Sequence, residues 1–214
     1  MGAITSTASG NGRDDEPPYY WPIPPPEGWA ADDLDRIPGL PPHTELIDGS
    51  LVFVSPRTAF HGRCVRLLEN SLLEQAPDHL DVMREMTIKL DIKNRPEPDV
   101  LVFPVEANTG PKQTWYKPED IVLAAEVVSP DSRERDREVK LRKYAAAEVP
   151  HFWRVEDDDN GLPVVYVYEL DSATKSYALT GIFHDRLKLT VPFEVEIDLT
   201  AINQRRGGSA SPGD

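Results

Sequence analysis

The sequence predicts one α/β or α+β domain: a central mixed β-sheet flanked by helices, with an N-terminal hairpin and a C-terminal β meander. Three observations support this prediction. Short apolar runs bounded by prolines and lacking helical period are typical of core strands. Two stretches at helical spacing interrupt these runs, and an Asp-Gly dipeptide early in the series indicates a hairpin. At 214 residues, the chain is long enough to bury a substantial core.

The two ends of the chain differ in composition from the middle. Residues 1–29 are rich in Gly, Ser, Thr and Pro and cannot build a core, which predicts a disordered, Pro-rich acidic tail. Residues 204–214 also lack a core-forming pattern, which predicts a second disordered tail. The folded domain is therefore expected to span residues 30–203. It should open with a short helix from Ala31 to Ile37, capped by Asp32 or Asp33.

The first half of the domain is predicted to form a hairpin, a helix and a strand. Asp48-Gly49 lies between two strand-like runs within residues 44–55, which is a strong hairpin signal. Residues 59–75 carry apolar side chains at helical spacing, and Pro77 lies just beyond them. Residues 81–92 alternate between apolar and polar types, which predicts a strand with one solvated face.

Two core strands and a second helix come next. The strands are residues 99–103 and 121–128, and Ser129-Pro-Asp-Ser132 supplies N-cap chemistry for a helix of about residues 133–147. A further strand follows at residues 151–155. The meander then completes the domain with segments 164–170, 177–180 and 186–191.

Each of the two core strands carries one carboxylate where a buried strand should have none. These are Asp99 and Glu126. An ionised carboxylate in such a strand costs several kcal/mol unless a metal, a cation or a proton compensates it. Two carboxylates from adjacent strands would suit a hard divalent cation that keeps some of its waters. Satisfied acids at the sheet edge are the alternative for either residue alone, but together they favour a site.

The charge is unevenly distributed. The net charge of −14 argues against a generic nucleic-acid coat protein. Residues 1–35 contribute −6, from seven acids against one arginine, whereas residues 133–143 hold six basic groups against three acids. A second basic cluster comprises Arg57, His61, Arg63 and Arg66. Positive patches can therefore exist on this acidic protein, although a solvated face is the default interpretation of each cluster.

The sequence also favours a cytoplasmic protein. Cys64 is the single cysteine, which excludes an internal disulfide and fits a reducing compartment. No run of 18 apolar residues and no secretory signal is visible, so neither a spanning helix nor a membrane partner is expected.

Five motifs in consistent order carry a family resemblance. They are Glu45-Leu-Ile-Asp-Gly, Pro98-Asp99, Glu126-Val-Val-Ser-Pro130, Lys140-Leu-Arg-Lys-Tyr144-Ala and Val149-Pro-His-Phe-Trp153. With these, from about residue 32 to 155, the chain resembles the Uma2 family of the restriction-endonuclease-like, PD-(D/E)XK superfamily. The resemblance implies a central mixed sheet with flanking helices, a divalent metal (Mg²⁺ or Mn²⁺) and cleavage of phosphodiester bonds in nucleic acid. DNA is the favoured substrate, and RNA stays open.

The resemblance also implies roles for single residues. Asp99 matches the metal-binding aspartate that follows the proline, and Glu126 matches the second acid. The backbone carbonyl of Val127 would be a further metal ligand. Glu45 matches an upstream acid that holds a second ion or a water.

The lysine of the superfamily pattern is displaced in this chain. It should stand two places after the second acid, where this sequence has Val128. Uma2-like sequences carry a lysine in the following helix instead, and Lys140 matches it. A lysine beside the metal would stabilise developing negative charge or orient the attacking water. A surface ion pair with Asp136, four residues earlier, is the competing role of Lys140.

Weaker candidates complete the predicted site. His61, Arg63 and Arg133 are potential phosphate contacts, although a lone helical histidine is more often structural or solvated. No Cys/His spacing suggests zinc, and no Gly-rich phosphate loop is present.

Two functions remain open at this level. One is a divalent-metal-dependent endonuclease, favoured by the joint presence of Glu45, Asp99, Glu126 and Lys140. The other is a catalytically inactive nuclease-fold domain with a binding or regulatory role, favoured by Val128 and the acidic net charge. The substrate's sequence and strandedness, the biological role and the oligomeric state, including a homodimer, are not determined by the sequence.

Overall fold

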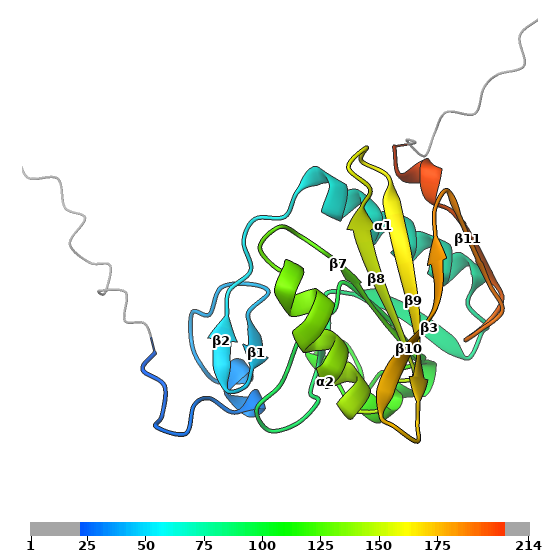
Figure 1. Cartoon of the computed structure of the whole chain (residues 1–214). Helices are drawn as coiled ribbons and strands as arrows, with labels where there is room; N and C mark the ends of the chain where they lie inside the picture. Colours follow the sequence, from blue (N-terminus) through cyan, green and yellow to red (C-terminus); the bar gives the residue numbers. More distant parts are fainter. Residues whose placement is uncertain (1–21, 204–214) are drawn as a thin grey trace, which may run out of the picture.

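The computed structural model describes residues 22–203 and is built on a six-stranded sheet (Figure 1). The strand order is β10-β9-β8-β7-β5-β3, with β7 parallel to β8 and every other neighbouring pair antiparallel. The strands are β3 (Leu80–Arg84), β5 (Val100–Pro104), β7 (Leu123–Val127), β8 (His151–Asp157), β9 (Pro163–Asp171) and β10 (Ser176–Phe183). The predicted fold class is confirmed. Residues 1–21 and 204–214, which include most of both predicted tails, lie outside the described residues.

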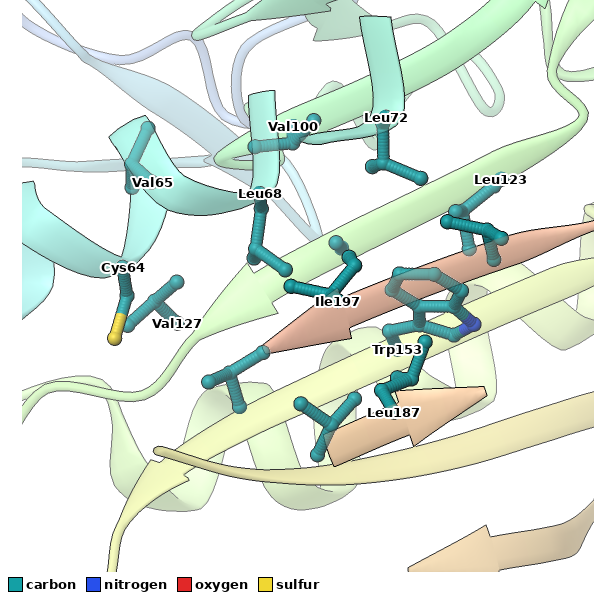
Figure 2. Packing of buried hydrophobic residues seen from close by; sticks show 14 of the residues in the cluster. Cys64, Val65, Leu68, Leu72, Val100, Leu123, Val127, Trp153, Leu187 and Ile197 are labelled. Carbon is teal, nitrogen blue, oxygen red and sulfur yellow. The ribbon is translucent and has the colours of Figure 1, made fainter. Parts of the chain in front are cut away.

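Helix α1 (Ala59–Gln75) packs against one face of the sheet. It begins where the Thr58 hydroxyl accepts a hydrogen bond from the His61 backbone N–H, a standard N-cap contact. Its apolar residues recur at helical spacing and therefore gather on a single side of the helix. Figure 2 shows them against the sheet; the labelled members of this core are Cys64, Val65, Leu68, Leu72, Val100, Leu123, Val127, Trp153, Leu187 and Ile197.

Helix α2 (Lys140–Ala146) covers the opposite face and follows a π-helical turn, η4 (Arg135–Val139). Tyr144 is fully buried there beside the ring of Phe152, in a second apolar cluster. Because side chains alternate along a strand, β7 serves both faces. Its odd-numbered residues join the α1 core, while Ala124 and Glu126 face α2.

The predicted hairpin is confirmed as β1 (Glu45–Ile47) paired with β2 (Ser50–Val52). Asp48 and Gly49 have φ angles of 50° and 74°, as a two-residue turn with positive φ at both positions requires. The hairpin is attached to the domain by reciprocal backbone hydrogen bonds between Leu46 and Arg95, of 3.1 and 2.8 Å. The Trp29 backbone N–H donates to the Gly49 carbonyl at 2.8 Å, immediately before the predicted domain boundary at residue 30. That boundary stays a prediction.

The single strand predicted at residues 81–92 is wrong. Glu85, with φ of 56°, breaks it into β3 and the short β4 (Thr87–Ile88). β4 pairs in parallel with β6 (Trp115–Tyr116) outside the main sheet. The break lets Ile88 enter the α2-side core, where it is fully buried. A continuous strand could not have done this, because it would have kept to the sheet edge.

The predicted meander is correct for β9 and β10 and wrong for the segment after them. β11 (Arg186–Leu189) leaves the main sheet and pairs with β12 (Val195–Asp198), a strand that the sequence pattern did not predict. Six strands span about 24 Å at the usual spacing, and one helix covers only about 10 Å of that width. Leu187, Val195 and Ile197 fill the uncovered part and join the α1 core.

Short 3-10 turns connect these elements. They are η1 (Ala31–Asp35), η2 (Val105–Ala107), η3 (Pro118–Asp120) and η5 (Leu199–Asn203). η1 replaces the short helix predicted at residues 31–37, and Asp33 caps it by accepting the Ala30 N–H at 2.8 Å. None of the helices between residues 22 and 203 is long and apolar enough to cross a membrane.

Two adjacent leucines of α1 test this packing. Leu72 is fully buried, whereas Leu73 is 53% exposed. Leu72→Ala should lower the free energy of unfolding by about 3 kcal/mol, because it removes buried methyl groups and leaves a cavity. Leu73→Ala should change it by less than about 0.5 kcal/mol. Urea denaturation of both variants checks this, and equal losses would show that the predicted face of α1 is wrong.

Candidate functional site

A cleft of about 280 Å³ lies where β7, the segment preceding α1 and the η4–α2 helix meet. Its lining is mostly charged. The charged residues that line it are Glu45, Arg57, Glu97, Asp99, Glu126, Asp131, Arg135, Asp136 and Lys140. Four of the predicted site residues, Glu45, Asp99, Glu126 and Lys140, are therefore brought together, although they come from separate parts of the chain.

The ammonium group of Lys140 lies among three buried carboxylates. Lys140 Nζ is 2.7 Å from Glu45 Oε1, 2.9 Å from Glu126 Oε1 and 3.5 Å from Asp136 Oδ1. Burial alone would lower the pKa of Lys140, but the three carboxylates raise it well above its usual value. The side chain is 4% exposed, so the ion pair with Asp136 is buried rather than at the surface. Lys140 is thus a permanently charged group inside the protein.

The π-helical turn η4 helps to bring these groups together. The Lys140 backbone N–H donates to the Arg135 carbonyl, which adds one residue to the normal helical spacing at this point. Asp136 and Lys140 then both point inward, and both are buried. The Ser129–Ser132 turn precedes this helix, and the Ser129 N–H donates to the Ser132 hydroxyl at 3.0 Å. This contact lies outside the helix, and neither η4 nor α2 has a side-chain cap hydrogen bond, so the predicted N-cap chemistry is wrong.

Glu126 is buried near three other acids, Asp136, Asp99 and Glu45. Its Oε1 atom accepts hydrogen bonds from Lys140 and from the Tyr144 hydroxyl, at 2.9 and 2.7 Å. Burial raises the pKa of Glu126 well above its usual value, and Asp136, Asp99 and Glu45 add to this against the opposing effect of Lys140. A further cation near Glu126 would relieve this repulsion.

Asp99 is in the opposite electrostatic situation. Its Oδ2 accepts the Val127 backbone N–H at 2.7 Å, while Oδ1 contacts His61 Nε2 at 3.1 Å and the Arg57 guanidinium. Burial would raise the pKa of Asp99, but the hydrogen bond and charge of His61 and the charge of Arg57 lower it overall. Both oxygens are therefore engaged by groups of the protein itself.

One carboxylate oxygen of Glu45 accepts no hydrogen bond from the described residues. Its Oε1 accepts the Glu97 backbone N–H at 2.9 Å and contacts Lys140. Glu45 Oε2 is buried and has no hydrogen-bond partner among the described residues, with Arg135 Nε 3.6 Å away. Asp136 Oδ1 is likewise without a hydrogen bond in this part of the chain. Buried oxygens of this kind are candidates for binding something that the chain does not supply.

The three predicted phosphate contacts are placed differently. His61 is buried against Asp99 and does not line the cleft. Arg63 is exposed on α1 and bonds to the Asn203 side chain at 2.8 Å, and Arg133 is exposed and does not line the cleft. The arginines that do line it are Arg57 and Arg135, each 23% exposed in its side chain. Both belonged to the basic clusters of the sequence, but nothing in the pattern distinguished them from their neighbours.

The donor set fits Mg²⁺ or Mn²⁺ in its chemistry. Carboxylate and carbonyl oxygens are the ligands that such hard cations prefer, and Glu45 Oε2 is a buried oxygen without a hydrogen bond from any described residue. Within residues 22–203, however, no three acidic, histidine or cysteine side chains are already arranged to hold a metal ion. Lys140 contacts Glu45 and Glu126, and Arg57 contacts Asp99, so two cationic side chains of the protein already lie beside these acids.

The sheet, its flanking helices and this acidic cleft with a buried lysine define a restriction-endonuclease-like protein. The family model of Uma2, described as "Putative restriction endonuclease", matches residues 31–201, so the chain belongs to the Uma2 family, as its motifs predicted. A comparison with curated proteins finds no match. The fold is similar to the crystal structure of a putative nuclease belonging to DUF820 from Anabaena variabilis ATCC 29413. That similarity has a TM-score of 0.57 at 16% identity, over 80% of this chain and 95% of the other.

Replacing Lys140 tests the electrostatic structure of the cleft. Lys140→Met leaves three buried carboxylates without their shared cation and should lower the free energy of unfolding by about 3 kcal/mol. Lys143→Met is the matched control, because Lys143 pairs with Asp48, whose side chain is 71% exposed. It should cost less than about 1 kcal/mol. Urea denaturation at neutral pH measures both, and a stable Lys140→Met protein would contradict the buried ion cluster.

Proposed function

We propose that this protein is a divalent-metal-dependent endonuclease that hydrolyses phosphodiester bonds in DNA, with RNA as a second substrate to be tested. The observation that carries the proposal is the buried ammonium of Lys140, 2.9 Å from Glu126 in a cleft that also contains Asp99 and Glu45. Structural ion pairs seldom need so many buried acids around one lysine, because each acid costs desolvation energy. A cluster retained at that cost is typical of a functional site.

The residues that would hold the metal are Asp99, Glu126, Glu45 and the backbone carbonyl of Val127. A bound Mg²⁺ or Mn²⁺ would supply a Lewis acid for the phosphate and an activated water. Lys140 stays protonated at neutral pH, because its carboxylate neighbours raise its pKa. Its role is therefore to stabilise negative charge rather than to act as a base. Tyr144 fixes the orientation of Glu126 by its hydrogen bond to Oε1.

The alternative is a nuclease-fold domain that binds a partner without turnover. One observation favours it: Arg57 and Lys140 already neutralise the acids, so the cleft is compatible with a protein that uses no metal. Val128 also stands where the superfamily pattern has its lysine. Metal binding separates the two functions, because only the nuclease requires it.

The metal site predicts a stability change. Mn²⁺ should raise the melting temperature of the wild type by binding the folded state. Asp99→Asn should abolish that rise, because it removes the charge of one metal ligand. Differential scanning fluorimetry with and without Mn²⁺ measures this. An unchanged Mn²⁺ response in Asp99→Asn would contradict the assignment of this acid.

Lys140 predicts a catalytic effect. Lys140→Ala should lower the cleavage rate on the order of 100-fold while Mn²⁺ binding is retained, because a stabilising charge is lost. Lys143→Ala serves as the control and should cleave like the wild type. The assay uses plasmid, single-stranded DNA and RNA with Mn²⁺, below the unfolding temperature of each variant. Adding Val128→Lys to Lys140→Ala should recover part of the rate, and full activity of Lys140→Ala would leave the lysine without its role.

A further inference from the structure

Asp99 has three protein partners that compete with a cation for its two oxygens. Its Oδ2 is bound to the Val127 N–H, and its Oδ1 is shared by Arg57 and His61. An incoming cation would also be repelled by the guanidinium charge. Release of one of these partners would therefore make Asp99 a stronger metal ligand.

Of the three partners, Arg57 is the one whose side chain can turn away. Val127 donates from the backbone of a central strand, and His61 is 2% exposed on the sheet side of α1. Moving either would disturb the core. Arg57 instead lies between β2 and α1, at a position in neither helix nor strand, and its side chain is 23% exposed. Its Nε is buried without a hydrogen-bond partner among the described residues, so its present contacts leave the guanidinium incompletely used.

A phosphate group is the ligand best suited to accept hydrogen bonds from the free N–H groups of an arginine in this position. The planar guanidinium can bind two phosphate oxygens at once through parallel N–H groups. Arg57 lines the cleft together with Asp99 and Glu126, so a phosphate that enters the cleft meets it directly. The same movement that turns Arg57 to a phosphate removes it from Asp99 Oδ1.

We propose that Arg57 couples the two ligands of the cleft: it neutralises Asp99 in the free protein and transfers to a nucleic-acid phosphate when one binds, which opens Asp99 to a divalent cation. The proposal rests on the nuclease function above. A divalent cation then takes over the neutralisation of Asp99, so no buried carboxylate is left without a positive partner. Binding coupled in this way is reciprocal, and each ligand strengthens the other.

The first experiment measures Mn²⁺ binding by isothermal titration calorimetry without nucleic acid. Arg57→Gln should bind Mn²⁺ about tenfold more tightly than the wild type, because the competing guanidinium is gone. Arg135→Gln is the matched control, since it removes the same charge from the same cleft but lies 3.6 Å from Glu45. Its gain should be clearly smaller. Equal gains in the two variants would reduce the effect to general electrostatics and overturn the proposal.

The second experiment measures binding of a short fluorescent DNA duplex in EDTA by anisotropy. Arg57→Gln should bind several-fold more weakly than the wild type, and unchanged binding would overturn the phosphate half of the proposal. Arg57→Lys keeps the charge beside Asp99 and serves if the glutamine variant does not fold. It should bind Mn²⁺ like the wild type and DNA more weakly, because an ammonium cannot make the paired contact. DNA binding equal to the wild type would overturn the proposal.

These readouts are independent of cleavage. If the wild type cleaves DNA and Arg57→Gln has unchanged affinities for Mn²⁺ and DNA, the coupling proposal is wrong and the nuclease proposal stands. A wild type that never cleaves, with both affinities shifted as expected, contradicts the nuclease function and supports only the coupling between cation and phosphate.

Discussion

The buried ammonium of Lys140 is the interaction on which the site and one face of the fold depend. Three acids surround it: Glu45 from the hairpin, Glu126 from a central strand and Asp136 from the start of a helix. Without a cation between them, their buried negative charges would repel one another and push these elements apart. One cation shared among them makes the arrangement tolerable. The same helix carries Tyr144, which packs in the apolar cluster and bonds to Glu126. Site and core on this side of the sheet are therefore one structure.

The cleft has two electrostatic halves. Around Glu126 negative charge is in excess, and the pKa of this acid is raised first by burial and then by its neighbouring acids. Around Asp99 the positive partners prevail, and its pKa is lowered despite burial. A second cation would be attracted by the excess negative charge around Glu126. Around Asp99 it would have to compete with Arg57 and His61. For this reason our proposal makes Arg57, rather than Lys140, the residue whose position controls metal binding in the cleft.

A similar fold occurs at low sequence identity. A sheet with alternating apolar faces tolerates wide sequence change, which is consistent with a TM-score of 0.57 at 16% identity. The position of the lysine in the sequence also differs from the superfamily pattern. Val128 follows β7 and offers no charge, while Lys140 reaches Glu126 from a helix on the same face of the sheet. The proposed chemistry requires a positive charge near Glu126, and the helix supplies it here.

The sequence by itself determined the local elements and the unusual charges. Asp48-Gly49 specified the hairpin, helical spacing specified α1, and Asp99, Glu126 and Lys140 were recognisable from misplaced charge and family motifs. Tertiary structure decided the rest. Local alternation could not tell that β4 and β11 leave the main sheet, because strand pairing is settled by which apolar surface stays uncovered elsewhere. Composition also could not distinguish Arg57 from Arg63, because both are arginines of one basic cluster. Only the packing of α1 and of the segment before it places Arg57 at Asp99 and leaves Arg63 exposed.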